Sequence, residues 1–535
     1  MSKSLIRRVT AWNRFHICRP LILAFAVMPF AAARAGELEL HHADFHARVG
    51  MKVYAVVGDA PQATALTATL TGGPGGEQVV FDKKDKLAAE EAITLNFREL
   101  PKGTYTLTVT LLDKEGKSLK SAVRQFEKPY DGMPRVGLNE NNALCVRGKP
   151  FFPVSAWCIG SERESEIKEW SAYVNTLQGV GFTKDQWTIE GCRKVLDLAK
   201  MYDKLFIGPV SGSYWPKGST VSGSRMYGKD AHGKTLFERY ADHEKIAAYV
   251  DALKDHPSLL LWNWQDEPEL GEETFTPPEE VRKWTLTTHA RDPQHPVLMG
   301  NGGAFYARPV DNWGYRRILT YTYQHNEIPG PHKVPLTDVI SQDEYPIAYQ
   351  NDKNYTHTID SMCLGMDRMV EMNHNLTGFM ACVETCKMAK TGDIPAPTPA
   401  EIRLLCWANI IHGARGLTWF HYFTKTPEEN LAEMGRFLEQ ITRLTPAVCG
   451  PAYTGTITKT EKGGGRIDFM ATQEGSTVTL FSANLRRDAE TATFTFGKAP
   501  KRVTVVDENR SLEMKDKELT DRFAPLAVHI YRVEL

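Results

Sequence analysis

The sequence has no excess of charge of either sign, because 64 Lys and Arg residues stand against 65 Asp and Glu residues. The first 35 residues hold six of the basic side chains and no acidic one, so the remainder has a net charge of −7, from 58 basic and 65 acidic residues. It also lacks a basic run of the kind that nucleic acid and anionic membranes attract. We therefore expect neither as a partner.

Motifs for metal and phosphate chemistry are missing as well. The 16 His residues form no H-x-H or H-E-x-x-H pair, and there is no G-x-S-x-G elbow or phosphate loop. The nine Cys residues follow neither a zinc pattern nor a small disulfide framework. Cys382 and Cys386 fit a bridge in an oxidising compartment and buried free thiols equally well. We expect no metal and no cofactor.

No apolar run is long enough to span a bilayer. The most apolar stretch, Pro20–Phe30, follows a basic segment and precedes Ala33-Arg34-Ala35, whose small residues suit a signal peptidase. Residues 1–35 are therefore predicted to be a signal peptide cleaved after Ala35. The expected location is secreted or periplasmic.

What is present is an ordinary globular composition, 42% hydrophobic and 24% charged over 535 residues, which is long enough for several domains. Between Val53 and Phe126 the apolar residues alternate with period two, and the same pattern returns after Pro446. We expect an N-terminal Ig-like β-sandwich over 36–130 and a C-terminal β-sandwich over 450–535. Pro129–Gly137 has the composition of a linker.

The stretch 138–445 alternates short apolar runs with longer helical stretches, which is typical of βα units around a parallel sheet. Eight strands over this length predict an α/β fold with a (β/α)8 TIM barrel. An open doubly wound sheet is the alternative, but no glycine-rich phosphate loop follows any strand. The eight expected strands are Phe151–Trp157, Tyr173–Gln178, Lys204–Val210, Leu259–Gln265, Pro296–Asn301, Thr337–Asp343, Gly378–Glu384 and Gly416–Tyr422.

In such a barrel, catalysis takes place at the carboxyl ends of the strands. The fourth strand runs into Trp264-Gln265-Asp266-Glu267-Pro268, the sixth into Asp343-Glu344-Tyr345-Pro346, and the seventh ends on Glu384. Two carboxylates that face each other there can cleave a glycosidic bond, one protonated to donate to the leaving oxygen and one ionised at the anomeric carbon. Aromatic side chains suit the apolar face of a sugar ring. Those nearest the strand ends are Trp157, Trp264, Tyr345 and Trp419, and Asn175 lies on the second strand.

With these motifs the stretch from about 143 to 445 resembles the clan A retaining (β/α)8 glycoside hydrolases, in which β-sandwiches commonly flank the barrel. The resemblance includes the entry Leu144–Val154, the Asp266-Glu267-Pro268 tip, the Asp343–Pro346 tip and the stretch from Thr398 to Phe420. It implies that Glu267 is the acid/base and Glu384 the nucleophile. It also implies that Tyr345 orients the nucleophile and that Trp419 forms a platform under the sugar.

The sequence departs from the clan in one place, because Asp266 stands where the clan usually has Asn to bind the sugar 2-hydroxyl. A charge beside Glu267 would raise the proton affinity of that glutamate, or Asp266 would itself be the acid. Trp264, Asp266 and Asp343 are expected with Trp157, Asn175, Tyr345 and Trp419 among the substrate-binding residues.

The sequence thus predicts an exported enzyme that cleaves β-linked oligo- or polysaccharides with retention. The alternatives are a non-catalytic carbohydrate-binding barrel and a hydrolase in which Asp266 and Asp343 hold a cation.

Overall fold

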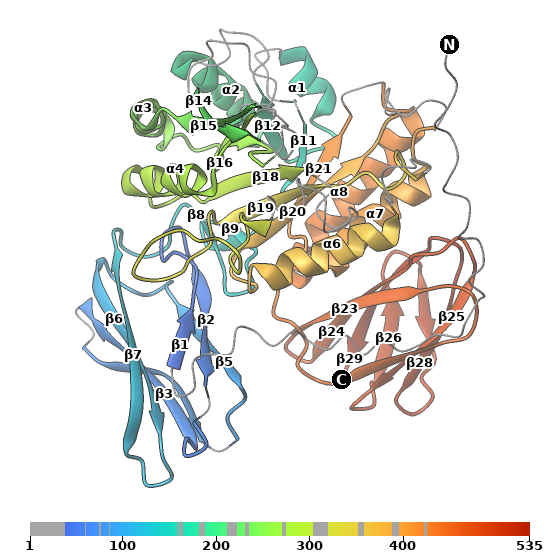
Figure 1. The fold of residues 1–535 in the computed structure, drawn as a ribbon. Coiled ribbons are helices and arrows are strands. Elements are labelled where there is room, and N and C mark those ends of the chain that lie inside the picture. The colour runs from blue at the N-terminus through green and yellow to red at the C-terminus, as the bar shows by residue number, and fades with distance from the viewer. Residues whose placement is uncertain are drawn as a thin grey trace, which may run out of the picture.

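The computed structural model describes residues 38–535 except 59, 74–75, 85, 158, 160–163, 181–187, 211–221, 230–234, 270–273, 303–318, 351–357, 388–394 and 422–424. The predicted signal peptide lies outside the described residues. Figure 1 shows a central parallel sheet surrounded by helices and two β-sandwiches on one side of it. Among the described residues, no helix combines the length and apolar character needed to cross a membrane.

The N-terminal part is a β-sandwich of two antiparallel sheets, ordered β1-β2-β5 and β4-β3-β6-β7. The inward-facing residues alternate along each strand, and Leu66, Leu95 and Val109 of the two sheets meet in one buried core. Its strands are β1 (Leu38–His41), β2 (Gly50–Val57), β3 (Ala65–Gly72), β4 (Gln78–Lys84), β5 (Glu90–Asn96), β6 (Gly103–Leu112) and β7 (Ser118–Lys128).

The segment that follows is not wholly the linker that its composition suggests, because Val136 and Gly137 belong to a strand. A three-stranded sheet forms from β8 (Val136–Leu138), β9 (Leu144–Val146) and β10 (Lys149–Pro150). Val136 and Leu138 pack against Leu298 and Val339, which start barrel strands. This small sheet therefore covers the amino-terminal end of the barrel with apolar side chains.

The centre of the molecule is an eight-stranded parallel barrel, as predicted, and the strands neighbour one another in the order of the chain. Its ends meet where the Asn175 amide donates to the Val154 carbonyl over 3.0 Å and Gln178 donates to the Ile159 carbonyl over 3.0 Å. This consecutive, closed order excludes the doubly wound alternative. The strands are β11 (Val154–Ala156), β12 (Thr176–Val180), β13 (Leu205–Val210), β16 (Leu259–Asp266), β18 (Val297–Gly302), β19 (Val339–Asp343), β20 (Gly378–Glu384) and β21 (Leu417–Phe420).

Helices cover the outside of the barrel and pack on the outward-facing residues of the strands. The helix α7 begins after a Thr398 cap, with Pro399 in its first turn and a Glu401 side chain that returns to the cap, a combination typical of helix starts. The described helices are α1 (Glu164–Trp170), α2 (Ile189–Met201), α3 (His243–Leu253), α4 (Pro278–Arg291), α6 (Ile359–Met372), α7 (Pro399–Ile411) and α8 (Glu428–Val448). A small side sheet contains β14 (Ser222–Lys229), β15 (Thr235–Ala241) and β17 (Thr274–Phe275).

The chain closes with a second β-sandwich, in which the sheets β22-β25-β28 and β23-β24-β29-β26-β27 enclose a core that includes Val478, Phe494 and Leu519. The fold class is therefore that predicted from the periodicity. Its strands are β22 (Ile457–Glu461), β23 (Ile467–Glu474), β24 (Thr477–Asn484), β25 (Glu490–Phe496), β26 (Arg502–Val505), β27 (Arg510–Leu512), β28 (Glu518–Phe523) and β29 (Val528–Glu534).

Candidate active site

Strand register decides which side chains face the inside of the barrel, because residues paired across parallel strands point to the same side. The pairs Gly302–Asp343 and Cys382–Thr418 place these positions on the inner face, and Thr418 pairs with Ser155. Ser155 and Thr418 are 2.8 Å apart at their hydroxyl oxygens. The carboxyl ends of the strands, which we call the mouth, therefore have a polar inner layer.

A β-bulge in β16 turns Asp266 into this layer. Trp262 pairs with Val297 and Asn263 with Leu298, but the next pair is Asp266 with Gly300, so three residues of β16 oppose two of β18. Such a bulge re-aims the side chain that follows it. A Cβ atom on Gly300 would lie 2.8 Å from Asp266 Oδ1, so the carboxyl group lies directly over that glycine.

Before the bulge, the indole of Trp264 points outward, and the prediction that it binds substrate is corrected. The Trp264 ring stacks on Trp262 at 5.3 Å between centroids, and its Nε1–H donates to Thr288 of α4 over 2.9 Å. Trp264 is 5% exposed. It packs the strand against a helix.

Glu267 follows Asp266 with a backbone φ of 45°, in the left-handed region that a glutamate rarely adopts. Its amide still donates to the Gly300 carbonyl over 2.9 Å, so this conformation is held by the edge of β18. Strained residues of this kind collect at functional sites. The conformation places Glu267 beside Asp266 and close enough to Asp343 for their charges to interact.

Asp266, Glu267 and Asp343 form what we call the carboxyl cluster. Burial raises the pKa of Glu267 to about 8, and the charge of Asp343 adds to the effect. Burial also raises the pKa of Asp266 well above its usual range, with the charges of Glu267 and Asp343 contributing. Groups that share a site in this way titrate as a unit, and here two of the three favour the protonated form at neutral pH.

Asp343 differs because two neighbouring groups donate hydrogen bonds to it. Burial raises the pKa of Asp343 to about 6, and hydrogen bonds from the Cys382 thiol and the Tyr345 hydroxyl work in the opposite direction. The Tyr345 hydroxyl lies 3.2 Å from Asp343 Oδ2. Cys382 and Cys386 are both free, so no bridge restricts the thiol. Asp343 is the member of the cluster that ionises most easily.

Glu384 lies at the end of β20, where its side chain holds a loop. Its two carboxyl oxygens accept the backbone N–H groups of Ile347 over 2.7 Å and Ala348 over 2.8 Å. Burial raises the pKa of Glu384 to about 8, these two bonds lower it, and the charges of Glu401 and Glu344 raise it. The side chain is 1% exposed. Its predicted role as nucleophile stays a prediction, and the contacts just named are structural.

Aromatic side chains gather at the mouth around Ala348 and Phe420. Phe420 pairs in register with Glu384, and its ring lies 4.8 Å from that of Tyr345 between centroids. Trp157 and Tyr349 pack against the same group. Trp157 and Tyr345 thus lie at the mouth, and their predicted roles in binding substrate stay predictions.

Trp419 is not a platform in this mouth, and that prediction is corrected. It pairs with Ala156 and Val383 on the outer face of the barrel, and its indole N–H donates to the Tyr173 carbonyl over 2.9 Å. The ring is 0% exposed and packs edge-on against Phe437 of α8. The aromatic residue that faces the mouth is its neighbour Phe420, which the sequence analysis missed.

Asn175 is also corrected, because it lies at the start of β12, away from the mouth. Its side chain accepts the Val154 amide over 2.8 Å and donates to the Phe152 carbonyl over 2.9 Å. Both side-chain groups therefore join the first two strands near the amino-terminal end of the barrel. Its role is to align β12 with the chain entering β11.

One further inward residue is Asn263, which lies below Asp266 on β16. It is 1% exposed, and neither its Oδ1 nor its Nδ2 atom has a hydrogen-bond partner within the part of the chain that the structure describes. Buried amides are normally hydrogen-bonded, so an unpaired one at the base of a polar layer suits a ligand hydroxyl or an ordered water. Alternation along β16 would have identified this residue.

Two groups of side chains have the composition of metal ligands: Cys363 with His412 and Asp468, and Asp44 with His289 and Asp338. Both lie where a sandwich meets the barrel. His412 lies between Asp367 and Asp468, at 2.7 and 3.1 Å, and His289 bonds Asp338 over 2.8 Å. These contacts are those of ion-paired histidines that join domains.

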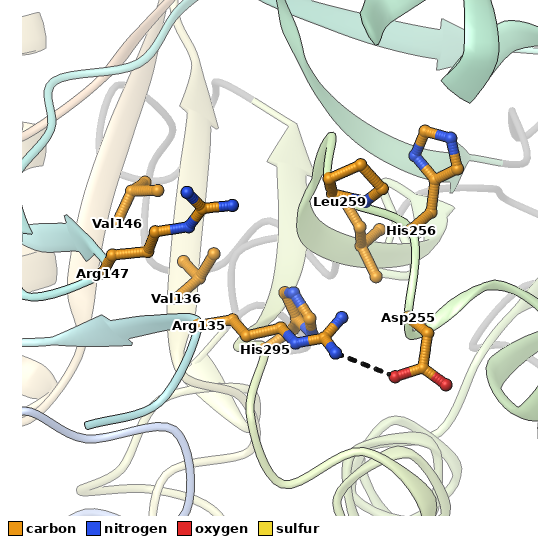
Figure 2. A pocket seen from close by; sticks show the side chains of 9 residues that line it. Arg135, Val136, Val146, Arg147, Asp255, His256, Leu259 and His295 are labelled. Atoms are coloured by element: carbon orange, nitrogen blue, oxygen red, sulfur yellow. Dashed lines mark hydrogen bonds and ion pairs between the residues drawn. The ribbon is translucent and has the colours of Figure 1, made fainter. Parts of the chain in front are cut away.

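A cavity of about 290 Å³ has Leu259, at the start of β16, in its lining (Figure 2). The carboxyl cluster lies at the opposite ends of the strands. The cavity is lined by the starts of β8 and β16 and by the loop before β18, and Arg135 pairs with Asp255 in it over 3.0 Å. The amino-terminal face of a TIM barrel serves stability, whereas chemistry takes place at the opposite face. We therefore place the candidate active site at the mouth.

No protein-family model matches this chain, and no curated protein matches it. Among solved structures, a family 39 glycoside hydrolase from the gut symbiont Bacteroides cellulosilyticus WH2 is 13% identical over 93% of this chain and 100% of its own, with a TM-score of 0.41. A cyclomaltodextrinase is 9% identical over 92% and 98%, with a TM-score of 0.48. A protein described as a glycoside hydrolase is 12% identical over 75% and 96%, with a TM-score of 0.48. At these identities the likeness is one of fold.

Proposed function

We propose that this protein is a glycoside hydrolase whose reaction takes place in the carboxyl cluster. The observation that supports this most directly is that Glu267 and Asp343, from the ends of two strands, lie close enough for their charges to interact, and burial raises their pKa values to about 8 and about 6. At neutral pH one carboxyl group is then protonated and the other ionised. This is the division of roles that cleavage of a glycosidic bond needs.

Glu267 is the proposed general acid, because it holds its proton at neutral pH and lies on a strand end. The proton passes to the leaving oxygen as the bond to the anomeric carbon breaks. Phe420, Tyr345 and Trp157 supply apolar rings for a sugar face. Asp266, with its pKa also raised, serves as a hydrogen-bond donor for a hydroxyl of the same sugar.

The finer features of the proposal follow from the sequence. We propose β-linked oligo- or polysaccharides as substrates, hydrolysis with retention, and export directed by residues 1–35. Retention requires an ionised carboxylate about 5–5.5 Å from the acid, whereas about 6.5–9.5 Å leads to inversion. The candidates for this carboxylate are Asp343, whose charge acts on Glu267, and Glu384 at the end of β20. The proposed reaction uses neither a metal nor a cofactor.

The test is hydrolysis of a panel of aryl β-glycosides and polysaccharides by the purified protein and by Glu267→Gln. We expect the parent to release product from at least one substrate, and the variant to be slower by roughly 10²–10⁴-fold with an unactivated leaving group. With a dinitrophenyl leaving group, which departs without a proton, the variant should keep a nearly normal kcat/KM, while its kcat falls because Glu267 can no longer take the proton of the attacking water. A chelator should leave the rate unchanged.

The same experiment separates the enzyme from a carbohydrate-binding barrel. Glycan binding by both proteins, with no hydrolysis of any substrate by the parent, would contradict the proposal and favour the binding protein. Loss of activity on chelation would favour a cation held by Asp266 and Asp343.

A further inference from the structure

We infer that Asp343, rather than Glu384, is the carboxylate that attacks the anomeric carbon opposite Glu267, and that Tyr345 and Cys382 are its positioning residues. The inference rests on the proposed function, since it assigns the second carboxylate of that reaction. Three features of the structure favour Asp343: the path across β18, the hydrogen bonds at each carboxylate, and an unpaired amide beneath the cluster.

The path between the two acids is open because β18 has glycines at its inner positions. Gly300 pairs with Asp266, and Gly302 pairs with Asp343. Neighbouring strands are about 4.8 Å apart, so β16 and β19 are separated by roughly 10 Å with β18 between them. With glycine at these two positions, β18 places no side chain between Asp266 and Asp343, and the charge of Asp343 acts on both Asp266 and Glu267.

The hydrogen bonds at Asp343 suit a nucleophile. Tyr345 donates to Oδ2 over 3.2 Å, and the buried Cys382 thiol donates to the same carboxyl group. Both groups favour the ionised form, and they fix the orientation of the side chain. Cys382 faces the mouth because it pairs with Thr418 on the inner face of the barrel. The donors thus come from two different elements, the end of β20 and the loop after β19.

The Glu384 carboxylate differs from that of Asp343 in the groups that it bonds. Both of its oxygens already accept backbone N–H groups, from Ile347 and Ala348, and only 1% of the residue is exposed. An attack on carbon would withdraw charge from the oxygens that accept these N–H groups and weaken the bonds that hold the loop of Tyr345 and Tyr349 at the mouth. Glu384 is therefore a positioning residue for this loop.

An observation independent of the acids also indicates a ligand here. Asn263 faces inward beneath Asp266, is 1% exposed, and has both amide atoms unpaired in the described part of the chain. A buried amide without partners is costly, and a sugar hydroxyl or its bound water would satisfy it. The carboxyl cluster therefore lies next to a second polar group that a bound sugar could satisfy.

The reaction then has two steps. The Asp343 carboxylate forms a bond to the anomeric carbon while the bond to the leaving oxygen breaks, and the Glu267 proton goes to that oxygen. Water then attacks the same carbon, gives its proton to the Glu267 carboxylate, and breaks the bond to Asp343. Substrate and water are consumed, a free sugar of retained configuration is released, and both carboxyl groups return to their first state.

The experiment uses the full chain and a dinitrophenyl 2-deoxy-2-fluoro-β-glycoside of a sugar that the parent hydrolyses. The fluorine slows the second step, so the attacking residue stays labelled, and mass spectrometry of tryptic peptides locates the label. Asp343 and Glu384 are separated by Arg368 and fall in different peptides. We expect the label on Asp343. A label on Glu384, or an inverted product without any label, would overturn the inference.

Matched variants give a second readout that does not depend on trapping. In Asp343→Ala, azide should occupy the vacated space, restore cleavage of the dinitrophenyl glycoside, and yield the α-glycosyl azide. Glu384→Ala should not form that product, even if its rate is lower. The reverse result would also overturn the inference. If the parent hydrolyses no glycoside at all, it is the proposed function that fails, so the two failures are distinguishable.

Discussion

Gly300 shows how one missing side chain shapes the site, because the Asp266 carboxyl group occupies the space where a Cβ would be. Replacing it with alanine would put a methyl group 2.8 Å from Asp266 Oδ1. The atom displaced is the end of a side chain, so the protein should still fold while the carboxyl group moves. Misplacement of a catalytic group by about 1 Å can cost on the order of 10²-fold in rate. We expect Gly300→Ala to lower kcat/KM by about that factor, measured with an aryl glycoside.

Gly435→Ala is the matched control. Gly435 is in α8, where an added Cβ would first meet Tyr173 at 3.8 Å, an ordinary contact. This variant should keep its activity and gain about 0.5–1 kcal/mol of stability, because glycine is unfavourable within a helix. Equal activity of Gly300→Ala and Gly435→Ala would contradict the placement of Asp266.

At the residue scale, the sequence indicates which strand ends hold chemistry but not which way each side chain points. Asp266, Glu267, Asp343 and Tyr345 are found together, as expected from their positions at strand ends. Trp264 and Trp419 point outward, since facing alternates along a strand and a shift of one residue reverses it. Phe420, the neighbour of Trp419, is the residue that faces the mouth. The bulge in β16, which turns Asp266 inward, has no signature in the sequence.

At the scale of elements, the start of α7 is set by local chemistry. The Thr398 hydroxyl accepts the Glu401 amide over 3.3 Å, and Glu401 Oε2 accepts the Thr398 amide over 2.7 Å. Losing such a cap costs about 1 kcal/mol. We expect Thr398→Ala to lower the free energy of unfolding by about that amount in urea, while Thr398→Ser keeps the cap. Equal stability of Ala and Ser variants would show that the cap contributes nothing.

The eight barrel strands and the start of α7 were predictable because period and capping are local signals. The similar run Thr276-Pro277-Pro278-Glu279 also predicts a Thr cap, but α4 begins after Pro277 without a side-chain cap bond. The hairpin of β8 and β9 was not predictable, since the composition of Pro129–Gly137 resembles a linker. Val136 is in a strand because it packs on Leu298 and Val339 at the base of the barrel. That contact joins parts of the chain that are far apart in the sequence, so no local sequence pattern predicts the strand.

At the scale of the whole molecule, ion pairs join the sandwiches to the barrel. Asp44 of the N-terminal part accepts two hydrogen bonds from Arg282 of α4, over 2.5 and 2.9 Å. On the other side Asp360 of α6 pairs with Arg466 over 3.0 Å and with Arg486 over 2.6 Å. Breaking one partner of a buried pair is costly, so the Asp44–Arg282 contact favours one arrangement of the N-terminal sandwich and the barrel, whereas the exposed pairs of Asp360 contribute less.

His412 offers a test of this bracing. Burial lowers its pKa, but hydrogen bonds with Asp367 and Asp468 outweigh burial and raise it to about 12. A raised pKa means that the stabilisation is complete below the unfolded value of 6.5 and is lost as pH rises from there toward 12. We expect His412→Gln to lower Tm most at pH 6, and the difference from the parent to shrink by pH 9. A Tm difference that grows with pH would contradict the charged state of His412. The activity of His412→Gln should equal that of the parent at every pH.

The most direct test of the central claim is the dependence of kcat/KM on pH for an unactivated glycoside. Asp343 must be ionised, so activity should rise through about pH 6, and Glu267 must be protonated, so activity should fall through about pH 8. The two limbs belong to the coupled pair. With a dinitrophenyl glycoside, Glu267→Gln should lose the fall at high pH and keep the rise at low pH. A profile without limbs between pH 5 and 9, or an alkaline limb that persists in Glu267→Gln, would contradict the account.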